Sequence, residues 1–288
     1  MDIVPQLIIN SLIAGSIYAL LAMSFNFIFG ATKFFNFAHG SYALIAGYVT
    51  FYFVRRLGWP DYLGIIIGLL SAGLSAYILD KIINLPLRKK KATDAVKLVS
   101  SLDQYFAIGS FIAILFTSQF QSLARPNSVQ KIFIFYNAAF AQTHIFMFLS
   151  ALFALFFFLT IFKFTLFGKA VKAISDDEEV AKIVGINTNK IISGVFFIGA
   201  VISGLEGILT GYDTGIQPIM GLGLFLKGVI AAIIGGLGSI PGAFLGAYLL
   251  GFVENFGIWK ISGEWKDAIA FGLLIIFLIF RPNGILRK

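Results

Sequence analysis

Several ionisable side chains stand inside long apolar stretches of this sequence, where a charge is costly. We single out His39, Glu206 and Glu254, whereas Asp103 lies near the cytoplasmic end of its span, where an interfacial position accounts for it. An ionisable group at bilayer depth normally faces a bundle interior or water, and it can serve a solute path, a gate or proton coupling. The two carboxylates would equally serve structure alone, through a hydrogen bond or by pairing with a basic residue such as Lys227. For Glu206 and Glu254 both interpretations stay open.

Asn36 and His39 belong to one short segment, and we name both as candidates for lining a path. For His39 we favour a packed, hydrogen-bonded side chain at a helix break. His144 is the other of the two histidines, and neither has a Cys or carboxylate at metal-ligand spacing, so we expect no metal and no cofactor. The sequence also lacks the Gly-x-x-x-x-Gly-Lys-Ser/Thr loop that cradles ATP phosphates. We expect a non-catalytic chain, with any ATP hydrolysed elsewhere.

The elements that hold these residues are predicted to be membrane-spanning helices. Of 288 residues, 58% are hydrophobic and 12% are charged, whereas soluble domains carry about 25% charged residues. We predict an all-α polytopic bundle, a single transmembrane domain over residues 1–288, with about eight full spans of about 20 residues each. One further segment, 222–234, is short, and we predict that it forms a half-helix or a re-entrant segment. The apolar segments cover residues 7–30, 34–54, 62–84, 98–118, 144–167, 191–212, 222–234, 240–257 and 268–280.

Basic residues concentrate in three connecting regions, which predicts an orientation. The net charge of +8 lies in short loops rather than on one face, which argues against a nucleic-acid partner. By the positive-inside rule, these regions are cytoplasmic and the N-terminus is external. The last two regions lie on the same side of the membrane only if the short segment 222–234 also crosses the membrane. The basic residues are Arg88, Lys89, Lys90, Lys91 and Lys97; Lys163, Lys169, Lys172, Lys182 and Lys190; and Arg281, Arg287 and Lys288.

Small residues recur at four-residue spacing in three of the spans and predict close helix packing. Such packing fits a channel, a transporter or an inert scaffold equally well. Glu206 comes seven residues after Gly199 and shares its helix face. The stripes are Gly64, Gly68, Ala72 and Ala76; Gly199, Ser203, Gly207 and Gly211; and Gly238, Gly242 and Gly246.

One predicted cytoplasmic loop, residues 168–190, carries a helix of its own. Ser175 and Glu178 form an S-x-x-E capping box at its start, and Gly185 is the natural residue after its end. A helix of about two and a half turns is marginal alone in water, so its apolar face should dock on something. That face is predicted to contain Val180, Ile183 and Val184.

We interpret this loop as a coupling element that docks on a separate protein; the alternative is a membrane-surface connector between two spans. The acidic residues from Asp176 to Glu179 would stabilise the helix, because they lie at the positive, N-terminal end of its dipole. The residues assigned to the coupling loop are Gly168, Lys169, Ala173, Ser175, Asp176, Glu178, Ala181, Gly185 and Ile186.

Six segments, in order along the chain, resemble LivH-type permeases, the permease subunits of branched-chain amino acid ABC transporters. Asn-Phe-Ala-His-Gly and Gly-Gly-Leu-Gly-Ser-Ile-Pro-Gly-Ala are the most specific of them when taken together. Glu206 departs from the small apolar residue expected at its place in the family pattern. The segments cover residues 15–20, 36–40, 168–187, 235–243, 264–267 and 281–286.

The resemblance implies an importer of the bacterial inner membrane. In such a system this chain pairs with a second related permease chain, two cytoplasmic ATPase subunits bind it, and a periplasmic binding protein delivers leucine, isoleucine or valine. The family's ATPase-contacting loop corresponds to residues 168–187. Urea, short amides and other hydrophobic amino acids are the alternative solutes.

Two other classes of function compete with the importer. An ion-coupled secondary transporter would use Glu206 or Glu254 as its coupling carboxylate, but inverted repeats would favour it and no internal repeat is evident. A channel or scaffold without energy coupling would have no use for the capped loop helix.

Overall fold

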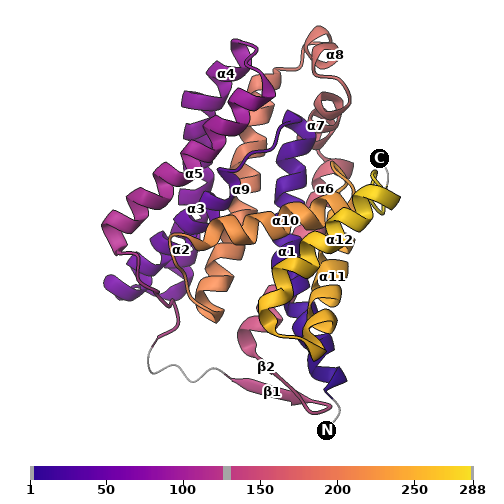
Figure 1. Cartoon of the computed structure of the whole chain (residues 1–288). Coiled ribbons are helices and arrows are strands. Elements are labelled where there is room, and N and C mark those ends of the chain that lie inside the picture. The colour runs from indigo at the N-terminus through magenta and orange to yellow at the C-terminus, as the bar shows by residue number, and fades with distance from the viewer. Residues whose placement is uncertain (1–2, 126–130, 287–288) are drawn as a thin grey trace. The chain divides into compact units, whose positions relative to one another are not determined.

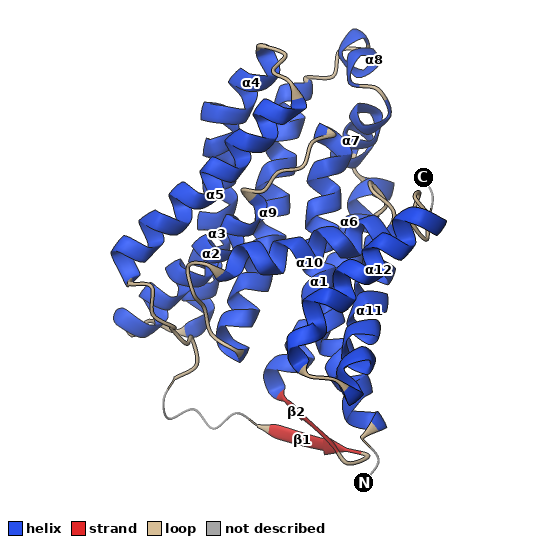
Figure 2. Ribbon diagram, viewed as in Figure 1, coloured by secondary structure: helices blue, strands red, loops and turns tan. Residues whose placement is uncertain are grey.

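The computed structural model describes residues 3–125 and 131–286. Most of them are helical, which confirms the predicted all-α polytopic bundle (Figures 1 and 2). Arg287 and Lys288, part of the basic tail used for the orientation, lie outside the described residues.

The longer helices match the apolar segments of the sequence closely. The predicted segment 240–257, for example, is the helix α11, Ile240–Gly257. The other long helices are α1 (Val4–Thr32), α2 (His39–Phe51), α3 (Asp61–Leu79), α5 (Asp94–Phe116), α6 (Gln142–Phe164), α9 (Thr188–Asp213), α10 (Met220–Gly235) and α12 (Lys266–Phe280).

Shorter elements fill the connections. Two π-helical turns, η1 (Tyr52–Arg56) and η2 (Asp80–Asn84), extend α2 and α3, and two 3₁₀ turns, η3 (Ile258–Lys260) and η4 (Gly263–Trp265), join α11 to α12. The remaining short elements are α4 (Leu85–Lys89), α7 (Leu166–Asp176), α8 (Glu178–Ile183), β1 (Ile132–Phe135) and β2 (Ala138–Ala141).

Fewer helices than predicted satisfy the length needed for a full span. Within the described residues, five are long and apolar enough to cross a membrane, and α10 with α11 forms a sixth candidate bent by 115°. The segment 34–54 falls short because its helix begins only at His39: the Asn36 side chain accepts a hydrogen bond from the Ala38 amide at 3.1 Å, which favours a turn. α12 has 15 residues.

The short segment predicted as a half-helix or re-entrant is α10. The sharp bend between α10 and α11 agrees with that interpretation, because a broken helix is tolerated at membrane depth where protein surrounds it.

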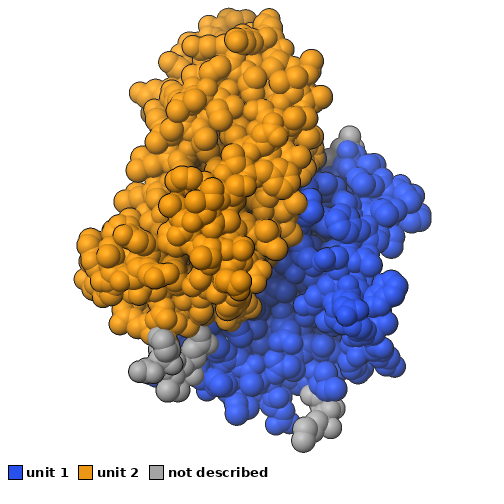
Figure 3. Space-filling model, turned by 60° about the vertical axis from the view of Figure 1, so that its left-hand side comes forward, with its two compact units in different colours: residues 1–26, 126–157, 226–288 blue, residues 27–125, 158–225 orange. Residues whose placement is uncertain are grey.

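The chain divides into two compact units, which Figure 3 shows in different colours. The first contains residues 1–26, 126–157 and 226–288, and the second contains residues 27–125 and 158–225. The prediction of a single transmembrane domain over residues 1–288 stays a prediction.

In the second unit, α2, α3 and α9 pack against one another. Gly64, Gly68 and Ala72 are buried on α3, and Gly199, Gly207 and Gly211 are buried on α9. At Gly207 a Cβ atom would collide with the backbone carbonyl of Ala43 on α2, so only glycine allows this approach. The small residues of the predicted stripes on these two helices thus lie at buried positions.

In the first unit, α11 turns back onto the end of α10. Cβ atoms at Gly242 and Gly246 would collide with the carbonyls of Gly235 and Ala231, so a side chain at either position would force the two helices apart. Gly238 was predicted to belong to the same stripe, and this was wrong. It lies in the turn between the helices with φ of +81°, a conformation that glycine adopts without strain.

The first unit also contains a β-hairpin that the apolar pattern did not predict. β1 and β2 pair antiparallel from Ile132 opposite Ala141 to Phe135 opposite Ala138. Tyr136 and Asn137 form its turn, both with positive φ, as two-residue hairpin turns of type I′ require.

Candidate functional site

The predicted coupling loop begins with α7 in the second unit. Thr165 caps this helix, its hydroxyl accepting a hydrogen bond from the Gly168 amide at 2.9 Å. A Cβ atom at Gly168 would collide with the carbonyl of Ile161, so the chain turns sharply there. Val171 and Ile174 are buried, while Lys169 and Asp176 are exposed and Ala173 is half-buried. α7 thus turns one apolar face inward and a polar face outward.

The second helix of this loop, α8, starts later than predicted. Its N-cap is Asp177, whose Oδ1 accepts hydrogen bonds from the amides of Glu179 and Val180 at 2.8 and 3.0 Å. The capping box of Ser175 and Glu178 was therefore wrong, because Ser175 is buried within the last turn of α7. α8 has six residues, fewer than the two and a half turns predicted.

The end of α8 is as predicted. Gly185 has φ of +89°, its amide donates to the carbonyl of Lys182, and the Ile186 amide donates to the carbonyl of Ala181, both at 3.0 Å. These two bonds form a Schellman motif. The helix is short but closed at both ends by hydrogen bonds.

The surface of α8 is divided into an inner and an outer face. Ala181 is buried, and the Thr188 hydroxyl donates to Glu178 at 3.2 Å. Hydrogen bonds to Glu179 and Glu178 raise the pKa of Lys182. Three apolar side chains remain largely outside: Val180 is 54% exposed, Ile183 is 83% exposed and Val184 is 69% exposed. We call these three residues the α8 apolar face.

Among the path candidates, Asn36, His39 and Glu206 are all fully buried in the second unit. The Ser203 hydroxyl of α9 donates to the backbone carbonyl of His39 at 3.3 Å, so the start of α2 is held against α9. The His39 ring lies beside those of Tyr42 and Phe225, with centroids 6.0 and 6.2 Å away. His39 is thus a packed residue at a helix start.

Glu206 makes few polar contacts for a buried carboxyl. Its Oε1 accepts the Thr210 hydroxyl at 2.8 Å, while Oε2 has no hydrogen-bond partner among the described residues. Thr210 in turn lines a groove of about 330 Å³ with Thr214 and Gln217. One hydroxyl therefore links Glu206 to a surface hollow whose walls are partly polar and partly apolar, with Phe120, Met220 and Leu224 among its lining residues.

Glu254 has quite different surroundings in the first unit. Its Oε1 pairs with Lys227 Nζ of α10 at 2.6 Å, and its Oε2 accepts the Tyr18 hydroxyl of α1 at 2.8 Å. Lys227 also pairs with Asp267 of α12 at 2.9 Å. The pairing with Lys227, one of the two alternatives left open, is present. Sequence reasoning missed Tyr18 and Asp267, although both belong to segments that carried the family resemblance.

Asn26 is a second residue that sequence reasoning missed. Its side chain donates to the carbonyls of Gly236 and Ser239, each at 3.0 Å, and accepts from the Gly238 amide at 3.3 Å. These bonds satisfy backbone groups exposed by the break between α10 and α11. The Gly-Gly-Leu-Gly-Ser-Ile-Pro-Gly-Ala segment therefore forms a glycine turn fixed by one buried amide.

A third missed group lies at η2 in the second unit. Asp80 is fully buried and pairs with Arg88 at 2.8 Å, and the Ser193 hydroxyl of α9 donates to it at 2.6 Å. An acid inside a predicted span, eight residues before an arginine, was the available signal. A buried carboxylate with these partners fixes the end of α3 against α9.

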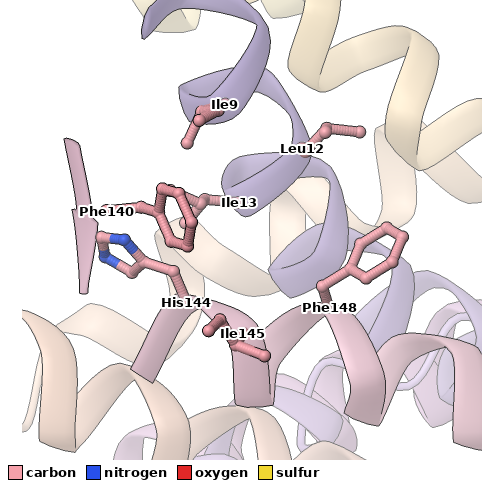
Figure 4. A pocket seen from close by; sticks show the side chains of 7 residues that line it. All are labelled: Ile9, Leu12, Ile13, Phe140, His144, Ile145 and Phe148. Carbon is pink, nitrogen blue, oxygen red and sulfur yellow. The ribbon is translucent and has the colours of Figure 1, made fainter. Parts of the chain in front are cut away.

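A pocket of about 210 Å³ in the first unit contains none of the predicted path residues (Figure 4). Its walls come from α1, β2 and α6, and they are apolar except for His144, whose Nδ1 accepts the Ala141 amide at 3.1 Å. Such a lining suits an apolar group and has no fixed charge with which to hold an amino acid. The residues are Ile9, Leu12, Ile13, Phe140, His144, Ile145 and Phe148.

The family model and the relatives that match this chain carry the same description, that of branched-chain amino acid permeases. The family model described as "Branched-chain amino acid transport system / permease component" matches residues 7–278. The high-affinity branched-chain amino acid transport system permease protein BraD of Pseudomonas aeruginosa is 32% identical, over 98% of this chain and 95% of its own. The corresponding permease protein LivH of Escherichia coli K12 is 28% identical, over 98% and 95%.

One solved structure, PsaBC from Streptococcus pneumoniae in complex with Fab, matches with a TM-score of 0.54 and 16% identity, covering 98% of this chain and 93% of that one. At this identity the match shows a shared fold alone.

Proposed function

We propose that this chain, which belongs to the family of branched-chain amino acid transport system permease components, is the non-catalytic permease subunit of a bacterial inner-membrane importer for leucine, isoleucine and valine. The nearly full-length match to permeases with these names supports the substrate class. The chain itself is a multi-pass membrane protein, as its apolar helices show.

The observation that carries the proposal is the α8 apolar face. Val180, Ile183 and Val184 are exposed on a short helix that is closed at both ends. A helix this short gains little from its own hydrogen bonds, and exposed apolar side chains clustered in this way favour a protein contact. We assign this contact to an ATPase subunit, so that residues 168–190 form a coupling loop.

The remaining partners follow from the family. A second related permease chain completes the membrane part, two ATPase subunits bind the cytoplasmic side, and a periplasmic binding protein delivers the solute. Specificity then resides largely in the binding protein, so the permease needs only a weak site, because tight binding would slow release.

The decisive test is uptake of radioactive leucine into proteoliposomes. The chain is reconstituted alone and with the second permease, the ATPases and the binding protein encoded beside it, under internal ATP or under an imposed proton gradient. We expect uptake only with all partners and ATP. A panel with isoleucine, valine, urea and a short amide defines the solute class.

Uptake by this chain alone under a proton gradient would contradict the proposal and establish an ion-coupled transporter. ATP-driven uptake of urea or amides without leucine would keep the importer and replace its solute.

A further inference from the structure

A carboxylate is exposed on α5, inside one of the helices long enough to cross the membrane. Asp103 lies nine residues after the start of α5 at Asp94, which is about 14 Å along the helix axis. The 23 residues of α5 exceed a hydrocarbon layer of about 30 Å by only about 5 Å. With α5 spanning this layer from end to end and the whole excess at its start, Asp103 lies about 9 Å inside the layer.

Contact with lipid is unfavourable for the carboxylate of Asp103. A charged group at bilayer depth normally faces a bundle interior, a partner or water, and aspartate is too short to reach far toward the surface. Asp103 is nevertheless exposed, and so are Ala107 and Ser110, four and seven residues later on the same helix face. Tyr105 and Ile112 are buried on the opposite face.

The face of α5 that contains Asp103 and Ser110 also carries the exposed apolar side chain of Ile114, and Ser110 borders a groove within the same unit. Its volume is about 250 Å³, and Phe106, Ser110 and Ala113 of α5 form one wall of it, with Ile219 and Leu222 on the other. The groove therefore combines a hydroxyl with apolar walls.

The two walls are joined by one buried tyrosine. The Tyr105 hydroxyl donates to the carbonyl of Ile219 at 3.3 Å and accepts from the Leu222 amide at 3.0 Å. The groove is thus fixed by hydrogen bonds at its base, and its shape does not depend on exposed side chains alone.

We propose that the Asp103–Ser110 face of α5 and this groove line the solute path, with the Asp103 carboxylate meeting the ammonium group of an amino acid and the groove receiving its aliphatic side chain. The inference rests on the proposed function and assigns the contact with the solute to particular residues of this chain. A single carboxylate with apolar walls gives the weak contact that a path requires, since a charged hydrogen bond in a wet site is partly offset by water.

Because the chain contains no cysteine, thiol labelling tests the proposal directly. Asp103→Cys, Ser110→Cys and the control Phe153→Cys are each reconstituted in the complete transporter and treated with a charged, membrane-impermeant methanethiosulfonate. Phe153 is 63% exposed on the apolar helix α6, so it reports a lipid-facing position. We expect D103C and S110C to react at least about tenfold faster than F153C, and saturating leucine to slow the reaction of S110C, which keeps the Asp103 carboxylate.

Transport by Asp103→Asn gives the second measurement. We expect leucine uptake to fall about tenfold, as the loss of one charged hydrogen bond predicts, with Asp103→Glu less affected and assembly with the ATPases unchanged.

Three results would overturn the inference. D103C reacting as slowly as F153C would place Asp103 against lipid or against the second permease chain. Rapid reaction of S110C without protection by leucine would place this face of α5 on a wet surface away from the solute, and full uptake by D103N would remove the role of Asp103. A failure of the proposed function would look different, since the wild-type complex would then take up no leucine whatever the labelling.

Discussion

Glu254 and Lys227 form a buried ion pair, and Lys227 has a second, largely exposed partner in Asp267. Glu254 is fully buried and the Lys227 side chain is 15% exposed. We expect Glu254→Gln to destabilise the protein by about 1–3 kcal/mol, because Lys227 loses its buried partner and keeps only Asp267. The apparent melting temperature in detergent measures this loss.

The double variant Glu254→Gln with Lys227→Met supplies the control. It removes both charges, so it should be less destabilised than Glu254→Gln alone. A double variant that melts lower than either single variant would show that the pair is not the reason for the loss.

Glu206 is the matched case without a basic partner. Its one hydrogen bond comes from Thr210, and the carbonyl of a glutamine accepts the same bond. We expect Glu206→Gln to retain ATP-driven leucine uptake within about twofold, whereas Glu206→Leu, which leaves the Thr210 hydroxyl without its acceptor, should lower stability by about 1–3 kcal/mol. Abolished uptake by E206Q with an unchanged melting temperature would return Glu206 to the role of a coupling carboxylate.

At the residue scale, the sequence could identify the two buried glutamates and Lys227 as a candidate partner, but not the Tyr18 hydroxyl or the hydrogen bond from Thr210. The partners of Glu254 are 27 and 236 positions away in the sequence, so no local pattern connects them. The role of Asn26 could not be predicted for the same reason. The turn to which it donates hydrogen bonds is distant in the sequence, so nothing around Asn26 indicates the contact.

At the scale of elements, the α8 apolar face makes a prediction about the coupling loop. Ile183 is 83% exposed, so Ile183→Glu should fold normally. If this face docks on the ATPase, a charge at its centre should weaken ATPase association at least about tenfold and lower uptake in parallel. Pull-down or light scattering with purified ATPase measures the association.

Glu179→Gln is the matched control, because its side chain is 79% exposed on the same helix but lies outside the apolar face. It should change association by less than about twofold. Equal effects of the two variants would indicate a general charge effect, and no effect of either would leave α8 as a connector.

The extents of most helices were predictable, because long apolar runs set them. Their detailed ends were not. Ser175 and Asp177 are both good capping residues, and the choice between them depends on the burial of Ser175 within α7, which is a property of the tertiary structure. The hairpin β1–β2 and the π-helical turns were missed because short elements leave little periodic signal.

At the scale of the whole chain, composition alone predicted the membrane class, and the family motifs predicted the permease. The number of spans was harder to predict, since hydropathy reports length and apolarity but not where a chain bends. The break between α10 and α11 and the late start of α2 at His39 both depend on backbone hydrogen bonds to side chains. Helices interrupted in this way are common where a membrane protein forms a path.

The break between α10 and α11 is also bound to a segment near the far end of the chain. The amides of Ile285 and Leu286 donate to the carbonyls of Ile234 and Gly235 at 2.9 and 3.0 Å. A Cβ atom at Gly236 would collide with the carbonyl of Leu286, and one at Gly284 would collide with the backbone of Gly236. During synthesis, residues 234–236 emerge some fifty positions before residues 284–286. The carbonyls of Ile234 and Gly235 therefore lack these two partners while translation continues, and the closure of the turn is a late event in biogenesis that needs residues 284–286.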